Sequence, residues 1–498
     1  MNDTDAASVH ADRSADDHHD RHVPHVVVVG GGISGLAAAY ALLRDSERAV
    51  HVTVLEARPR VGGDLRVIEV AGVAMDGGAE AMLQTRPEAV ALARNVGLGS
   101  ALEPPVTTKA SLLVGGRLRP LPARTLMGVP TDLRALAESD VLSIPALLKL
   151  PLERMQPGTP LTTDVSVGDY LRPRVGDEVV DRLVEPLLAG VYAGHADSLS
   201  LQASVPALFR ALKRQPSVLQ AAHDAYATGA SRAGARSGPV FMGIRGGVGR
   251  LALATAAALQ ERGGVVRTST TVRSLKRVDD MWQLEIGSAA APELLTADAV
   301  IVALPPVATA KLLKGASKQI ARELADEESA SVAVVAAAYR RRDVENLPDG
   351  SGYLVPPAEG RPVKAVTISS SKWGWLAREA HSADPDGLVM VRASVGRLGE
   401  NDILQREDAD LATIVHRDIR GQLGLRRKPV DSVVVRWGGA LPQYSVGHVE
   451  RVERIRAAVA ELPGLAVCGA FYDGLGIAAC VGAASVAASD IRAALSVR

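Results

Sequence analysis

The feature that most constrains this chain is a glycine-rich turn near its N-terminus, between an apolar run and an alanine-rich run. Residues 26–29 are four consecutive valines, which predicts a strand buried on both faces. Gly30, Gly32 and Gly35 follow in G-x-G-x-x-G spacing and open a predicted helix. The first glycine permits a tight turn, the second lets the backbone approach a pyrophosphate, and the third lets helix pack on strand. The pattern predicts a dinucleotide-binding strand–turn–helix unit.

A second predicted strand, His51–Leu55, ends in an acidic residue, Glu56, which lies 21 residues after Gly35. A carboxylate at this position accepts hydrogen bonds from the ribose hydroxyls of an adenosine. It also disfavours a 2′-phosphorylated cofactor, because two like charges would repel. The turn and the acid together indicate an adenine dinucleotide.

A further run, Arg58–Asp64, follows at once and reads R-P-R-V-G-G-D. It resembles the second signature of a large flavoprotein group that includes amine oxidases, phytoene desaturases and protoporphyrinogen oxidases. Glycines leave room for a cofactor beside the backbone, and arginine supplies counter-charge to phosphates. Plain NAD enzymes lack this element, so the resemblance implies FAD. Residues 76–80 continue the region as a turn that we expect to reach the edge of the flavin ring.

Charge and cysteine content exclude several other classes of protein. The 498 residues carry 56 Lys+Arg and 56 Asp+Glu, so a nucleic-acid-binding surface is not expected. The two cysteines, Cys468 and Cys480, form neither a disulfide framework nor a metal cluster; we expect buried, inert thiols in a reducing cytoplasm. No apolar run is long enough to predict a membrane-spanning helix. The first residues are polar and lack a secretory signal.

The fold class predicted from these patterns is α/β combined with α+β, in several pieces. Residues 1–23 are expected to form a disordered tail. Residues 24–104, 241–329 and 446–498 are assigned to one discontinuous Rossmann-type FAD-binding domain of the glutathione-reductase-like kind. In several places residues 330–445 alternate between apolar and polar residues, which predicts a substrate domain built on an antiparallel sheet.

Residues 105–240 are assigned to a helical subdomain of the membrane-facing type. Within it, the stretch 215–238 is rich in Ala, Ser, Gly and Arg, which favours a mobile surface loop. Peripheral contact between this subdomain and a membrane is left open, although no transmembrane segment is expected.

Four runs resemble the protoporphyrinogen/coproporphyrinogen oxidase family more closely than amine oxidases. They are V-E-P-L-L-A-G-V-Y-A-G at 184–194, G-Y-L-V-P at 352–356 with S-S-S-K-W at 369–373, L-P-Q-Y-S-V-G-H at 441–448, and G-A-F-Y-D-G-L-G-I-A-A-C at 469–480. The matches run in family order over nearly the whole chain.

By that resemblance, the FAD-binding positions come from both ends of the chain. They are Gly30, Gly31, Gly32, Ile33, Ser34, Gly35, Glu56, Ala57, Arg60, Gly63, Asp64, Gly78, Ala79, Glu80, Ala81, Val272, Trp437, Ala470, Leu475, Gly476 and Ile477. The N-terminus of the predicted final helix, at Ile477, also suits negative charge on a reduced flavin. Simple core packing would explain Trp437 equally well.

The substrate side is less well defined by the sequence. Some family members place an arginine for a propionate just before a strand that ends in Gly-Gly, and the matching residue here is Ala110. Lys109 and Arg86 are the candidate substrate residues, with Arg117 and Arg119 as further cations, and each of them also fits a solvated surface role. No catalytic acid or base and no metal ligand is predicted.

The resemblance implies oxidation of a porphyrinogen by molecular oxygen in haem biosynthesis. The expected reaction removes six electrons from coproporphyrinogen III, gives coproporphyrin III and releases hydrogen peroxide. Protoporphyrinogen IX is the alternative substrate. Amine oxidase, carotenoid desaturase and a non-enzymatic flavin-binding scaffold are more remote alternatives.

Overall fold

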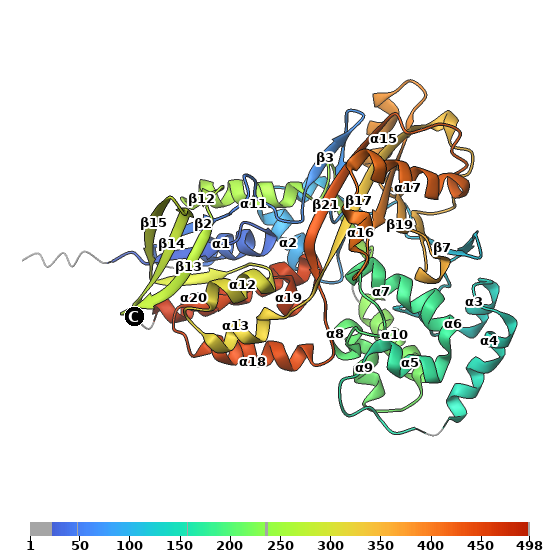
Figure 1. Ribbon diagram of the computed structural model, residues 1–498, viewed down its shortest axis with the longest axis horizontal. Helices are drawn as coiled ribbons and strands as arrows, with labels where there is room; N and C mark the ends of the chain where they lie inside the picture. The colour runs from blue at the N-terminus through green and yellow to red at the C-terminus, as the bar shows by residue number, and fades with distance from the viewer. Residues whose placement is uncertain (1–21, 47, 157, 235–237, 497–498) are drawn as a thin grey trace, which may run out of the picture.

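The computed structural model describes residues 22–46, 48–156, 158–234 and 238–496. Its strands and helices form three groups: a layered α/β region, a long twisted sheet, and a set of helices below that sheet (Figure 1). Residues 1–21, most of the predicted tail, lie outside the described residues. His22, at the edge of that segment, pairs its Nε2 with the Asp298 carboxylate at 3.0 Å.

The α/β region is built on a five-stranded parallel sheet in the order β12-β2-β1-β16-β22. The strands are β1 (His25–Val29), β2 (His51–Leu55), β12 (Val265–Arg267), β16 (Ala299–Val302) and β22 (Leu465–Val467). The valine run of β1 is fully buried, as expected of a central parallel strand with both faces covered. The strands come from distant parts of the chain, so the sheet forms only when these segments meet.

Helices cover both faces of this sheet. On one face lie α1 (Ile33–Asp45), α2 (Glu88–Asn95), α11 (Arg250–Glu261) and α20 (Ile477–Ser496). On the other face lie α12 (Pro306–Leu313), α13 (Lys318–Ala325), α18 (His448–Ala460) and the antiparallel strands β13 (Val272–Val278), β14 (Met281–Ser288) and β15 (Ala291–Ala297). Helix α20 is long and apolar enough to cross a membrane, but 56% of its most apolar window is buried inside the protein. Packing against α1 explains its composition as that of a core helix.

The second region is a seven-stranded sheet in the order β21-β17-β20-β19-β18-β7-β8. Its strands are β7 (Ser111–Val114), β8 (Arg117–Pro120), β17 (Ser329–Arg340), β18 (Gly352–Leu354), β19 (Val363–Ile368), β20 (Leu388–Val395) and β21 (Asp431–Pro442). All pairs are antiparallel except β7 with β18. Helix α17 (Asp408–Leu423) covers one face of the sheet.

The hairpin β7–β8 corrects one part of the sequence assignment, since residues 111–120 were included with the helical subdomain. They pair instead with β18 at the edge of the seven-stranded sheet. Gly115 and Gly116 both have positive φ, 58° and 73°, and therefore allow the tight turn that brings β8 back along β7. A second hairpin, β3 (Val67–Val70) and β4 (Val73–Asp76), and the short strands β5 (Met82–Leu83), β6 (Leu102–Glu103) and β11 (Phe241–Ile244) lie between the regions.

The helical subdomain contains α3 (Leu133–Glu138), α4 (Ile144–Lys149), α5 (Val167–Val175), α7 (Glu185–Tyr192), α8 (Leu201–Ser204), α9 (Pro206–Leu212) and α10 (Val218–Gly234). The prediction of a mobile loop at 215–238 is wrong, because α10 occupies most of that stretch. The Glu153 carboxylate accepts the Val218 N–H at 2.6 Å, and Leu219 and Ala222 are buried. A cap supplied from a distant segment and two buried side chains outweigh the loop-like composition.

Candidate functional site

The first glycine turn, residues 30–35, is crowded by backbone at two of its four glycines, Gly30 and Gly35. Gly30 has φ +111°, and an added Cβ would lie 2.5 Å from the Ala303 carbonyl oxygen. At Gly35 an added Cβ would overlap the Gly30 carbonyl oxygen. These two glycines are therefore required by the packing of α1 against β1 and the neighbouring strand end.

Two other glycines face free space. At Gly32 an added Cβ would meet nothing closer than the Gly63 Cα at 4.0 Å, and at Gly476 it would meet no described atom within 4 Å. No contact within the described part of the chain requires glycine at these two positions. Gly32 is the N-cap of α1 and makes no side-chain cap, so the first N–H groups of the helix are available to an anion. This is the room and the polarity that a dinucleotide pyrophosphate needs.

Glu56 lies directly against the glycine turn. Its Oε2 accepts the Gly31 N–H at 2.7 Å and its Oε1 accepts the Arg58 N–H at 2.8 Å. Two backbone donors thus fix the carboxylate at the end of β2, with Ala57 in the turn between them. The Glu56 carbonyl also accepts the Thr270 N–H at 2.8 Å, which places the start of β13, and with it Val272, close to the acid.

The predicted positions from the next two motifs also meet. Arg60 Nη2 donates to the Gly63 carbonyl at 3.0 Å, and an added Cβ at Gly78 would overlap the Asp64 carbonyl oxygen. Burial raises the pKa of the Asp64 carboxyl. Trp437, from the middle of β21, contacts both segments.

Trp437 is buried, and its indole Nε1 donates to the Gly77 carbonyl at 2.9 Å. The Arg60 guanidinium carbon lies 5.8 Å from the centre of the indole ring, within the range of a cation–π contact. The ring therefore joins the seven-stranded sheet to the segment that carries Gly78 and Ala79.

The final glycine turn lies beside the first one. Burial raises the pKa of the Cys480 thiol to about 11, and this thiol donates to the Gly474 and Leu475 carbonyls at 3.8 and 3.9 Å. Helix α20 packs against α1. Leu475, Gly476 and Ile477 consequently lie close to residues 30–35, and the Tyr444 hydroxyl donates to the Ala470 carbonyl behind them. Both cysteines are free and buried, as predicted.

Glu80 lies in a cluster of buried charges that the sequence did not suggest. Its carboxylate forms ion pairs with the Lys372 ammonium and, at 2.6 Å, with Arg392 Nη1. These two cations lower the pKa of Glu80 to about 2, against the opposing effect of burial. Arg392 Nη2 also donates to the Gly78 carbonyl. The cluster thus joins the predicted flavin-contacting segment to α14 (Ser369–Lys372) and β20.

The cations that the sequence offered for the substrate are scattered. Lys109 is 71% exposed and pairs with Asp349 at 2.9 Å. Arg86 pairs with Glu88 at 3.3 Å, near Gly482 in α20. Arg119 pairs with Asp140, and Arg117 is exposed. The structure brings none of them into one group. Arg392 is the cation that sequence reasoning missed; a lone arginine inside the apolar run of β20 was the available signal.

Partly exposed residues lie on two facing surfaces near this cluster. Directly paired residues of β19 and β20, Thr367 with Arg392 and Ala365 with Ser394, are partly exposed, although their neighbours along both strands are buried. Opposite them lies α7, which contacts β18 and β19. There Gly190 is exposed, and its added Cβ would lie 3.8 Å from a Leu354 methyl. Figure 1 shows α7 below this part of the sheet.

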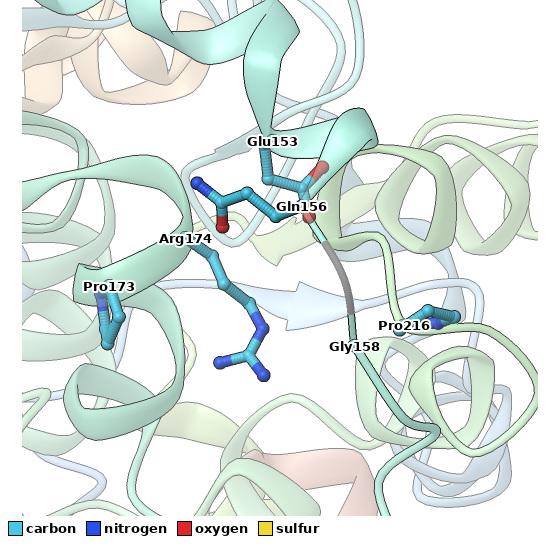
Figure 2. Close-up of a pocket in the computed structure, with 6 residues that line it drawn as sticks. All are labelled: Glu153, Gln156, Gly158, Pro173, Arg174 and Pro216. Atoms are coloured by element: carbon cyan, nitrogen blue, oxygen red, sulfur yellow. The ribbon is translucent and has the colours of Figure 1, made fainter.

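Two concave pockets lie elsewhere. A pocket of about 190 Å³ lies in the helical subdomain, with Gln156, Arg174 and Pro216 among its lining residues; Figure 2 shows the Arg174 side chain extending into it. A second pocket, of about 480 Å³, lies between the start of β17 and the loop at Leu398–Asn401. None of the predicted cofactor or substrate residues lines either pocket.

Comparison with known proteins identifies the class. Residues 33–492 match the family model for flavin containing amine oxidoreductases, and the chain belongs to that family. Its FAD-binding fold combines mixed sheets and helices, and its cofactor is FAD, for which the open space at Gly32 and Gly476 and the acid at Glu56 are suited.

The relatives narrow the class to porphyrinogen oxidases. The chain is 35% identical over 481 residues to the coproporphyrinogen III oxidase of Mycobacterium tuberculosis and 30% identical over 471 residues to that of Bacillus subtilis; each match covers 94% of this chain and 97% of the relative. It is 27% identical to the chloroplast protoporphyrinogen oxidase of tobacco, covering 94% and 86%. These matches confirm the resemblance predicted from the sequence.

Solved structures agree with this assignment. A protein of Exiguobacterium sp., provisionally named a protoporphyrinogen oxidase, superposes with a TM-score of 0.79 at 29% identity, covering 94% of this chain and 99% of the other. Cyclohexylamine oxidase from Brevibacterium oxydans superposes at 0.67 with 17% identity, covering 95% and 100%. The second likeness shows only the shared fold.

Proposed function

We propose that this protein oxidises coproporphyrinogen III to coproporphyrin III in haem biosynthesis. Six hydrogens leave the substrate in three two-electron steps, and three molecules of oxygen are reduced to three of hydrogen peroxide. The observation that carries the proposal is the match to coproporphyrinogen III oxidases over 94% of this chain. FAD supplies the two-electron acceptor.

In this proposal the chain's own residues bind FAD and hold it in position. The N-terminus of α1 and the glycines at 30–35 hold the pyrophosphate, and Glu56 holds the adenosine ribose. Arg60, Gly63, Asp64 and the segment Gly78–Ala81 lie along the rest of the cofactor. Trp437 and the turn at Ala470–Ile477 complete the same binding region. We assign no proton transfer to a protein side chain.

Protoporphyrinogen IX oxidation is the second candidate, and the tobacco relative favours it. Purified holoenzyme would be given each porphyrinogen in turn, with porphyrin fluorescence, oxygen uptake and peroxide followed together. We expect faster oxidation of coproporphyrinogen III, with about three oxygens consumed per porphyrin. A large preference for protoporphyrinogen IX would overturn the choice of substrate, and peroxide release from an amine alone would overturn the reaction class.

We further propose a cytoplasmic location and the glutathione-reductase-like variant of the FAD-binding fold. Two free, buried cysteines suit a reducing compartment. The five-stranded parallel sheet with its three-stranded antiparallel addition suits that variant. The domain limits predicted from the sequence are retained as part of this proposal, with residues 111–120 moved to the sheet.

A further inference from the structure

We propose that Arg392, together with Lys372 and Glu80, binds one propionate carboxylate of the porphyrinogen and so helps to select substrates rich in carboxylates. The inference rests on the proposed function, because it takes the ligand to be a porphyrinogen. It places the propionate-binding cations on β20 and α14. Some family members instead carry an arginine for a propionate at the position that is Ala110 here.

Charge balance is the first argument. One carboxylate, Glu80, faces two cations, and the side chains of Glu80, Arg392 and Lys372 are only 11%, 10% and 19% exposed. Asp76 also lies within electrostatic range of Arg392, but its two oxygens accept the Val248 and Gly249 N–H groups at 2.9 and 3.0 Å, and it forms no ion pair with either cation among the described residues. One carboxylate therefore serves both cations in direct ion pairs, and a second carboxylate can join them.

An unused donor is the second argument. Arg392 Nε is buried and has no hydrogen-bond partner among the described residues. Leaving such a donor unpaired costs about 1–3 kcal/mol. Arginine presents its N–H groups in a planar fork that suits a carboxylate, and two of its three nitrogens are already used by Glu80 and the Gly78 carbonyl.

Position is the third argument. Arg392 pairs directly with Thr367 on β19, so both side chains lie on the same face of the sheet. This is the partly exposed face that lies opposite α7. The Gly78 contact places the guanidinium next to the predicted flavin-contacting segment. A porphyrinogen between α7 and the sheet could therefore reach FAD with its ring and Arg392 with a side chain.

The test is a binding titration of FAD-loaded protein with coproporphyrin III and, separately, with its tetramethyl ester, followed by porphyrin fluorescence. We expect Arg392→Met to weaken binding of the acid at least tenfold and to leave the ester unchanged, while Arg392→Lys restores part of the affinity. Glu80→Gln removes the competing carboxylate and should tighten binding of the acid a few-fold. KM should rise in Arg392→Met with little change in kcat.

Arg340→Met is the matched control, since Arg340 ends β17 in an ion pair with Asp384 away from the cluster; it should leave both affinities unchanged. Equal weakening by Arg392→Met and Glu80→Gln would indicate a purely structural clamp and overturn the inference. A shift in flavin midpoint potential without a change in coproporphyrin binding would also overturn it, in favour of an effect on the cofactor. If the wild type oxidises no coproporphyrinogen III, the proposed function itself is wrong. That result comes from the wild-type protein alone and is therefore distinct from any result with the variants.

Discussion

The glycine turn at residues 30–35 and the sheet face around Arg392 are specified in different ways. At the turn, the fit depends on backbone and on missing side chains, and the glycines themselves lie within a few residues of one another. At the sheet face, it depends on side chains from β20, α14 and the segment at Glu80, which are close only after folding. A cofactor site made of backbone is therefore visible as a local motif, whereas a substrate site made of distant side chains is not.

The largest effect is expected where the turn serves the fold itself. Gly35→Ala places a methyl group on the Gly30 carbonyl oxygen, so α1 must move away from β1. We expect a loss of more than about 3 kcal/mol in the free energy of unfolding, seen as a lower thermal midpoint and little folded flavoprotein. Gly421→Ala in α17, where the new methyl meets no described atom within 4 Å, is the control and should be neutral or stabilising. Equal stability of the two variants would contradict this reading.

A second substitution in the same turn separates cofactor binding from folding. Gly32 has φ −70° and ψ 174°, which valine adopts readily, and its added side chain would enter the space assigned to FAD. We expect Gly32→Val to fold with a nearly unchanged thermal midpoint and to bind FAD at least about 100-fold more weakly, since the pyrophosphate could no longer approach the backbone. Titration of apoprotein with FAD measures this, and wild-type affinity would remove Gly32 from the site.

This contrast explains how much could be predicted from the sequence. The strand–turn–helix unit, the position of Glu56 and the final turn before Ile477 followed from short runs whose spacing has a direct geometric meaning. The antiparallel sheet was predicted from alternation of apolar and polar residues at several places between residues 330 and 445, although β17 itself is buried over most of its length. Each of these properties is local, and the structure has them where the sequence placed them.

The errors have a common physical origin in contacts between distant segments. Helix α10 was taken for a loop, because its cap comes from Glu153, about 65 residues earlier in the chain. The charge cluster was missed, because Glu80 reaches its partners across 292 and 312 residues. Lys109 was chosen because it lies beside Ala110, the position that matches the family arginine, and Arg86 was a further candidate cation; both choices are still predictions.

A pH effect on stability is expected at His448, the first residue of α18. His448 is buried, its ring stacks on Tyr444 at 4.1 Å between centroids, and it meets the Phe471 ring edge at 4.8 Å. Burial lowers its pKa to about 4, with Arg451 acting in the same direction and Asp164 against it. Because the unfolded chain takes up this proton near pH 6.5, stability should fall as pH decreases from about 6.5 to about 4, by about 3 kcal/mol in all.

His448→Phe keeps a ring in the stack and removes the titrating group. Its free energy of unfolding should change less across that pH range than the wild-type value, as followed by chemical denaturation at several pH values. His51→Phe, at an exposed position, is the control and should keep the wild-type slope. An unchanged slope in the His448 variant would assign the effect to other groups.

The smallest effect concerns Trp437, where core packing and cofactor contact remain alternative explanations. Trp437→Phe keeps an aromatic ring but loses the hydrogen bond to the Gly77 carbonyl, which should lower the free energy of unfolding by about 1 kcal/mol. If the indole also orders the Gly78 segment along FAD, the dissociation constant for FAD should rise a few-fold in the same variant. Unfolding of apoprotein and FAD titration measure the two quantities separately. A stability loss with unchanged FAD affinity would make Trp437 a core residue, and the backbone alone would then define this part of the cofactor site.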